Sequence, residues 1–173
     1  MRILLVAPFV YALFQGEYRA ALILIFVAGL SDGVDGFLAR QFDWRSRLGS
    51  LLDPAADKLL MVSAFLSLTT LGLVPLGLTL IVVLRDVVIV GGALTYQGLS
   101  GSLAGEPTFI SKLNTLFQLL FIFLTIVFAE WQQPDAYWLT WLGATVIFTS
   151  ITSGLTYVLV WSHKAHELVS DQQ

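Results

Sequence analysis

The sequence predicts an all-α integral membrane protein, a bundle of six transmembrane helices with both termini cytoplasmic. Of its 173 residues, 57% are hydrophobic and only 12% are charged, whereas a typical soluble domain has about 25% charged residues. Apolar windows of about 20 residues, the length needed to cross a hydrocarbon core of about 30 Å, recur along the whole chain. The basic residues, finally, fall mainly on one side of the predicted bundle.

Each predicted span is an apolar run bounded by polar residues or by a segment containing Gly or Pro. The spans are Ile3–Phe14, Ala20–Phe42, Leu48–Leu71, Leu78–Gln97, Thr108–Glu130 and Ala136–Trp161. A polar tail, His163–Gln173, follows the last span. Because these runs leave no room for a separate soluble domain, we expect residues 1–173 to form one membrane domain.

The basic residues predict the orientation, because Lys and Arg gather on the cytoplasmic side of membrane proteins. With six spans, the opposite side receives only Arg19. The side shared by the two termini collects Arg2, Arg40, Arg45, Arg47, Lys58, Lys112 and Lys164. The first ten residues show neither a cleavable signal peptide nor an Arg- and Ser-rich transit peptide. We therefore expect a retained first span and a bacterial plasma membrane, and nothing indicates a nucleic-acid partner.

The stretch from Ser31 to Lys58 carries four acids between apolar runs: Asp32, Asp35, Asp53 and Asp57. Ionisable groups at membrane depth are costly and usually mark a functional site. On a helix, residues three and four apart share a face. One stripe therefore contains Asp32, Asp35, Gly36, Ala39 and Arg40, and a second contains Gly49, Asp53 and Asp57. Because the connection between the two spans is short, we expect the stripes to face each other near the cytoplasmic surface.

Four ionised carboxylates in one pocket would repel one another strongly unless cations neutralise them. The chain has no Cys, and no His lies near this stretch, so the donor set favours Mg²⁺ or Mn²⁺. Two-metal carboxylate sites serve phosphoryl transfer, and the small residues would let a pyrophosphate approach the backbone. Small residues alone would also fit helix packing, and a single Asp would fit a hydrogen bond between helices. The four acids together favour the metal site.

Written as D-x2-D-G-x2-A-R-x8-G-x3-D-x3-D, residues Asp32 to Asp57 resemble the signature of the CDP-alcohol phosphatidyltransferase family at every specified position. The resemblance implies that an acceptor hydroxyl attacks the phosphate of CDP-diacylglycerol and releases CMP. It implies that Asp32, Asp35, Asp53 and Asp57 hold two metal ions and that Asp57 is the general base. It also implies a cytidine-diphosphate site, formed by Asp32, Gly36, Ala39, Arg40 and Gly49, and a homodimer among membrane lipids.

The acceptor is predicted from residues further along the chain. Arg85, Lys112 and Asn114 lie toward the cytoplasmic half and are expected to converge on an anion, such as the phosphate of the acceptor. Two alternatives stay open, since Arg85 could instead pair with Asp86, and Lys112 could merely extend to the membrane interface.

The segments PTFISKLNT (107–115) and RDVVIV (85–90) resemble those of the CMP-forming cardiolipin synthases, which use phosphatidylglycerol. Phosphatidylglycerophosphate synthases, which use glycerol 3-phosphate, are the alternative. Family members usually carry an amphipathic segment with Pro-Asn before the first span, and this sequence begins almost at the Arg that would follow that segment. A third hypothesis, an ion-coupled transporter, fits less well, because all four acids lie on one side of the membrane.

Overall fold

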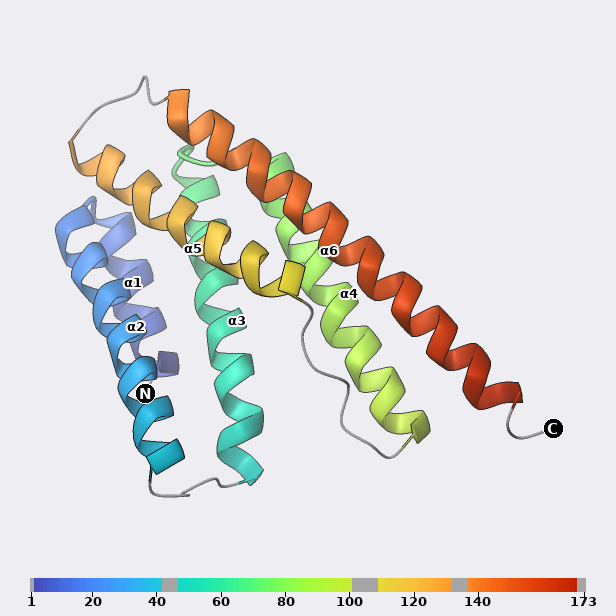
Figure 1. Ribbon diagram of the computed structural model, residues 1–173. Helices are drawn as coiled ribbons and strands as arrows, with labels where there is room; N and C mark the ends of the chain where they lie inside the picture. Colours follow the sequence, from blue (N-terminus) through green and yellow to red (C-terminus); the bar gives the residue numbers. More distant parts are fainter. Residues whose placement is uncertain (1, 42–46, 101–108, 132–136, 171–173) are drawn as a thin grey trace. The chain divides into compact units, whose positions relative to one another are not determined.

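A computed structural model describes the backbone of residues 2–41, 47–100, 109–131 and 137–170, and the side chains of residues 3–31, 57–92, 109–131 and 137–159. In this part of the chain the structure is all-helical, with six helices and no strand (Figure 1). The helices are α1 (Arg2–Phe14), α2 (Tyr18–Gln41), α3 (Arg47–Thr70), α4 (Leu76–Ser100), α5 (Phe109–Glu130) and α6 (Tyr137–Ser170). The predicted helix class and number are therefore confirmed for the described residues.

The end of α6 differs from the sequence prediction. We expected the helix to end at about Trp161 and a polar tail to start at His163, whereas the helix continues to Ser170. The segment HKAHELVS contains no Gly or Pro, and Ala, Leu, Glu and Lys are strong helix formers. The change to polar residues at this point therefore does not end the helix.

The chain divides into two compact units. Unit 1 contains residues 1–75 and 122–139, and unit 2 contains residues 76–121 and 140–173. Helix α5 therefore contributes its first part to unit 2 and its last part to unit 1.

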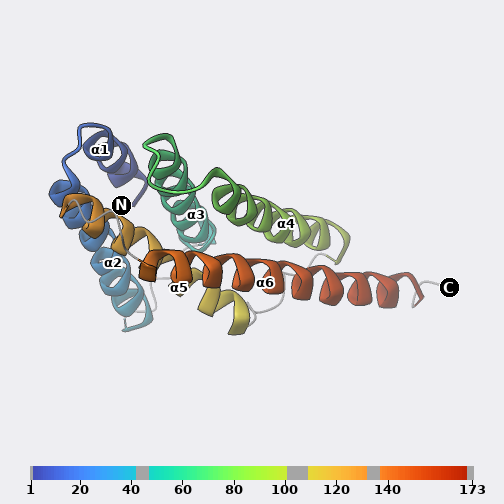
Figure 2. The same cartoon turned by 90° about the horizontal axis from the view of Figure 1, so that it is seen from above.

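In unit 1, α1 packs against both α2 and α3, and Figures 1 and 2 show it alongside both helices. The core contains fully buried side chains from all three: Phe9, Leu13, Ala21, Phe65 and Leu68. These residues remove apolar surface from contact with solvent or lipid and fix how α2 and α3 lie around α1.

Glycines end two helices of unit 1. Gly16 and Gly72 both have φ of +74°, a conformation that glycine adopts without steric cost. The Gly16 nitrogen donates to the Leu13 carbonyl at 3.1 Å, and the Glu17 nitrogen donates to the Ala12 carbonyl at 2.9 Å. At Gly72, which follows α3, the backbone forms two hydrogen bonds with the same spacing along the chain. This is the Schellman arrangement, which satisfies the last carbonyls of a helix and turns the chain.

In unit 2, α6 approaches α4 and α5 at Gly143. A Cβ atom at this position would lie 3.2 Å from Leu78 Cδ1 and 3.3 Å from Phe121 Cε2. Val82 and Val146 are fully buried in the same unit. Glycine therefore permits a close contact among the three helices that a larger residue would disturb.

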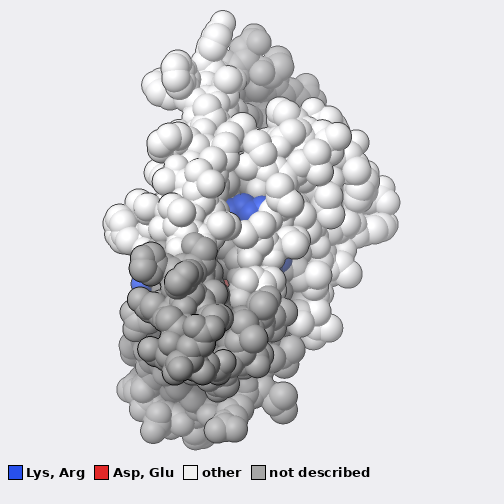
Figure 3. All heavy atoms as spheres, turned by 90° about the vertical axis from the view of Figure 1, so that its right-hand side faces the viewer, with Lys and Arg blue, Asp and Glu red and all other residues white. Residues whose placement is uncertain are grey.

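The described helices have the composition and surface of membrane helices. Phe109–Glu130 and Tyr137–Leu159 are long and apolar enough to cross a membrane, and Ile3–Phe14 and Tyr18–Ser31 are shorter apolar helical segments. Large apolar side chains are exposed along α6, including Trp141, Phe148 and Leu155, at 60% or more. The described atoms on the face in Figure 3 include very few charged residues. Apolar surface this extensive is unusual in water-soluble proteins and fits an environment of lipid.

Candidate functional site

The acidic stretch lies on two consecutive helices of unit 1. Asp32 and Asp35 belong to the last part of α2, and Asp53 and Asp57 belong to the first part of α3. Because both segments are helical, residues three and four apart lie on one face of their helix. Residues 42–46, which connect the helices, lie outside the described backbone. Figure 1 shows the end of α2 and the start of α3 at the same end of unit 1.

Most of the predicted site residues lie outside the part of the structure whose side chains are described. These are Asp32, Asp35, Gly36, Ala39, Arg40, Gly49 and Asp53. Asp57 is described and is half-buried on α3. Among the described side chains there is no group of three or more His, Cys, Asp or Glu able to hold a metal ion. Since three of the four acids fall outside that set, the meeting of the two stripes stays a prediction.

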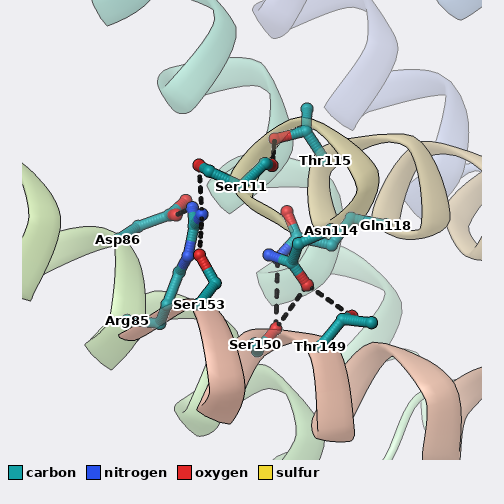
Figure 4. Close-up of polar contacts among 9 residues, drawn as sticks. All are labelled: Arg85, Asp86, Ser111, Asn114, Thr115, Gln118, Thr149, Ser150 and Ser153. Atoms are coloured by element: carbon teal, nitrogen blue, oxygen red, sulfur yellow. Dashed lines mark hydrogen bonds and ion pairs between the residues drawn. The ribbon is translucent and has the colours of Figure 1, made fainter. Parts of the chain in front are cut away.

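Arg85, a predicted acceptor-binding residue, is 5% exposed in α4 of unit 2 (Figure 4). Its Nη1 atom forms an ion pair of 2.7 Å with Asp86 Oδ1. Its Nη2 atom donates to Ser111 Oγ of α5 at 2.6 Å and to Ser153 Oγ of α6 at 2.7 Å. The guanidinium therefore links three helices, and its charge is compensated by Asp86, as one of the sequence alternatives proposed. Arg85 Nε has no hydrogen-bond partner among the described residues.

Asn114, one turn further along α5 from Ser111, is completely buried. Its Oδ1 atom accepts a hydrogen bond from Ser150 Oγ at 2.9 Å and lies 2.8 Å from the donor Thr149 Oγ1. Gln118, one turn further again and also completely buried, donates from Nε2 to Ser150 Oγ at 3.5 Å. Together these residues form a polar layer within unit 2, composed of Arg85, Asp86, Ser111, Asn114, Gln118, Thr149, Ser150 and Ser153.

Lys112, the remaining acceptor candidate, is exposed. On a helix, residues two apart point about 200° from each other, so Lys112 and Asn114 lie on different sides of α5. The structure therefore brings Arg85 and Asn114 into one polar layer and leaves Lys112 outside it.

Five residues of the polar layer were not predicted from sequence as site residues: Ser111, Gln118, Thr149, Ser150 and Ser153. A usable signal was present on α5, because Ser111, Asn114 and Gln118 follow the i, i+3, i+7 spacing of one helix face within an apolar span. On α6, Ser150 and Ser153 are similarly three residues apart. Polar stripes in two predicted spans indicate helices that face each other rather than lipid.

Comparison with known proteins identifies the family. A model of that family, described as CDP-alcohol phosphatidyltransferase, matches residues 1–160. The human protein named "Cardiolipin synthase (CMP-forming)" is 33% identical over 163 residues, which cover 85% of this chain and 54% of that protein. A Streptomyces coelicolor protein of the same name is 32% identical over 143 residues, 82% of this chain and 62% of that protein.

A rice protein has a different name, "CDP-diacylglycerol--glycerol-3-phosphate 3-phosphatidyltransferase 1, chloroplastic". It is 33% identical over 158 residues, which cover 81% of this chain and 48% of that protein. The chain spans about half the length of the human and rice relatives. The family model extends over nearly the whole sequence and includes both helices of the acidic stretch. The chain therefore belongs to the CDP-alcohol phosphatidyltransferase family.

Proposed function

We propose that this protein transfers the phosphatidyl group of CDP-diacylglycerol to the hydroxyl of an acceptor, with phosphatidylglycerol as acceptor and cardiolipin as product. The observation that carries the proposal is the family match over residues 1–160, which contains all eight specified residues of the acidic signature. Relatives named cardiolipin synthase in animals and bacteria support phosphatidylglycerol. The transporter hypothesis receives no support from these relatives.

In the proposed reaction, the acceptor oxygen attacks the phosphorus of the phosphatidyl group. A new phosphorus–oxygen bond forms as the bond to the CMP oxygen breaks, so CMP leaves with that oxygen. The proton of the acceptor hydroxyl passes to the carboxylate of Asp57. Asp57 is half-buried on α3, a setting in which a carboxylate can be held close to substrate and partly shielded from water.

The acidic stretch fits divalent ions, because its side-chain donors are carboxylate oxygens and it contains neither His nor Cys. In the proposal, Asp32, Asp35, Asp53 and Asp57 hold two Mg²⁺ or Mn²⁺ ions. When bound, such ions neutralise charge on the attacking and leaving oxygens. The cytidine diphosphate would be held by Asp32 and Arg40, next to Gly36, Ala39 and Gly49, where side-chain bulk is small.

The acceptor is proposed to interact with Arg85, Lys112 and Asn114. Arg85 and Asn114 belong to the polar layer, which would receive the polar headgroup. Lys112 is exposed and free to extend toward a phosphate at the membrane surface. Glycerol 3-phosphate remains the alternative acceptor, because the rice relative named for it is as similar to this chain as the human cardiolipin synthase.

The decisive experiment supplies purified protein with CDP-diacylglycerol, Mg²⁺ or Mn²⁺, and either phosphatidylglycerol or glycerol 3-phosphate. CMP release is measured, and the lipid product is identified by mass spectrometry. We expect cardiolipin with phosphatidylglycerol. Formation of phosphatidylglycerophosphate alone would select the alternative acceptor, and no metal-dependent CMP release with either acceptor would overturn the proposed function.

We further propose one domain of six membrane spans, both termini and the acidic stretch facing the cytoplasm of a bacterium, and a homodimer. The lack of Cys in the chain makes the orientation testable by labelling single introduced cysteines. Cells carrying Gln133→Cys should react with a membrane-impermeant maleimide, whereas cells carrying Gln173→Cys should react only after they are opened. The reverse pattern would contradict the orientation, and cross-linking in membranes would test the dimer.

A further inference from the structure

Two buried side-chain atoms of the polar layer have no hydrogen-bond partner among the described residues. They are Asn114 Nδ2 and Gln118 Oε1. Both residues have a relative exposure of 0%. Buried polar atoms are nearly always paired with protein, water or a ligand. These two atoms therefore call for an occupant that the described residues do not supply.

The neighbouring hydroxyl groups determine which atom of each amide group has no hydrogen-bond partner among the described residues. Asn114 Oδ1 accepts from Ser150 Oγ at 2.9 Å, so its amide nitrogen is the unpartnered end. Gln118 Nε2 donates to the same Ser150 oxygen at 3.5 Å, so its amide oxygen is the unpartnered end. The polar layer thus offers one spare donor, from Asn114, and one spare acceptor, from Gln118.

The two atoms come from neighbouring turns of one helix face, since Asn114 and Gln118 are four residues apart on α5. Figure 4 shows their amide groups next to each other, facing Thr149 and Ser150 of α6. A phosphate dianion accepts but does not donate, and an ammonium group donates but does not accept. A hydroxyl group does both.

A further donor lies beside this face one turn earlier, where Arg85 of α4, which is paired with Asp86, meets Ser111. Ser111 accepts a hydrogen bond from Arg85 at 2.6 Å, and Arg85 Nε has no partner among the described residues. The face therefore presents a guanidinium followed by a donor and acceptor pair. This order matches a molecule in which a phosphate is linked through carbon to a hydroxyl.

We infer that Asn114 and Gln118 bind the secondary hydroxyl of a glycerol group in the acceptor, and that Gln118 is a specificity-determining residue. The inference rests on the proposed function. Both candidate acceptors carry this hydroxyl, the terminal glycerol of phosphatidylglycerol and the central carbon of glycerol 3-phosphate. The reacting hydroxyl is the adjacent primary one, so the proposed contact orients the acceptor and takes no part in bond making.

The test compares each acceptor with an analogue that lacks only the secondary hydroxyl. Phosphatidylglycerol is paired with phosphatidyl-1,3-propanediol, and glycerol 3-phosphate with 3-hydroxypropyl phosphate. The measured quantity is the ratio of kcat/KM values within each pair, with CMP release as readout. The wild-type protein should prefer the glycerol compound about tenfold or more, because the analogue leaves both amide atoms unpaired. The acceptor whose kcat/KM ratio shows this preference is the molecule that supplies the hydroxyl.

Gln118→Met keeps the size of the side chain and removes the amide, so the preference should fall severalfold, to what the Asn114 contact alone supports. The matched control is Thr152→Val, since the Thr152 hydroxyl donates to the Phe148 carbonyl of its own helix at 2.8 Å. This control should keep the wild-type ratio. An unchanged ratio in Gln118→Met would overturn the inference.

If the wild-type protein uses both members of each acceptor pair equally, the inference is also overturned. The proposed function would still stand, and water would be the occupant of the site. This measurement needs no variant, so it decides even if Gln118→Met fails to fold. No CMP release with any of the four acceptors would overturn both the inference and the proposed function.

Discussion

Arg85 Nη1 lies 2.7 Å from Asp86 Oδ1, and both side chains are at least 95% buried. Each charge is therefore compensated by its neighbour in sequence. Ser111 and Ser153, from two other helices, accept hydrogen bonds from Nη2 of the same guanidinium. The pair consequently contributes no net charge to the interior of unit 2, although both of its members are ionisable.

Asp86→Asn should destabilise the protein strongly, because it leaves the buried Arg85 guanidinium uncompensated. Removing one partner of a buried ion pair costs about 3–5 kcal/mol. Thermal unfolding in detergent should show a clear fall in the midpoint. The double variant Arg85→Met, Asp86→Leu should recover much of the loss, since it buries no charge. If the fall in the unfolding midpoint of the double variant equals the sum of the falls in the two single variants, the coupling of the two side chains is contradicted.

The exposed ion pair of unit 1 should behave differently. Arg19 Nε lies 2.5 Å from Glu130 Oε1, but the Arg19 side chain is 82% exposed. Exposed pairs contribute about 0–1 kcal/mol, because solvent screens them and two long side chains must be ordered. Glu130→Gln should therefore change the unfolding midpoint much less than Asp86→Asn does under the same conditions. Equal falls in the unfolding midpoint would show that burial does not determine how much each ion pair contributes to stability.

Gly143→Ala should reduce stability, because the added Cβ would lie 3.2 Å from Leu78 and 3.3 Å from Phe121. Overpacking of this kind typically costs about 1–3 kcal/mol. Gly29→Ala is the matched control, since nothing lies within 4 Å of a Cβ at that position. The control should be neutral or slightly stabilising in α2. If the two variants unfold at the same temperature, the close contact at Gly143 does not restrict the size of the residue at this position.

Lys112→Ala should raise the KM for the acceptor and leave the KM for CDP-diacylglycerol nearly unchanged, because Lys112 is proposed to meet the acceptor phosphate. Lys112→Arg should retain most of the wild-type acceptor KM by keeping the charge. Initial rates of CMP release, measured while one substrate is varied at a time, separate the two constants. If both values stay at the wild-type level in Lys112→Ala, this residue is only an interface anchor.

The helices were predictable from sequence because apolar runs are long and clearly interrupted, as at Gly16 and Gly72, which end α1 and α3 with positive φ. The end of α6 was not predictable in this way. The polar residues from His163 onward indicate that the chain leaves the apolar surroundings, but the backbone stays helical. In the acidic stretch, fixed spacing of four Asp residues was visible in the sequence alone. The polar layer was only partly visible, because the partners of Arg85 and Asn114 on α6 are ordinary Ser and Thr residues brought close by folding.

The central claim is that the carboxylates of α2 and α3 carry out the transfer, and it is tested most directly by CMP release from CDP-diacylglycerol with Mg²⁺ or Mn²⁺ and phosphatidylglycerol. Loss of a general base typically slows a reaction about 10²–10⁴-fold. Asp57→Asn should lower the rate by at least this much while CDP-diacylglycerol still binds. Glu17→Gln, which removes an exposed acid outside the stripes, should retain the wild-type rate. Turnover by Asp57→Asn at a rate close to wild type would contradict the account.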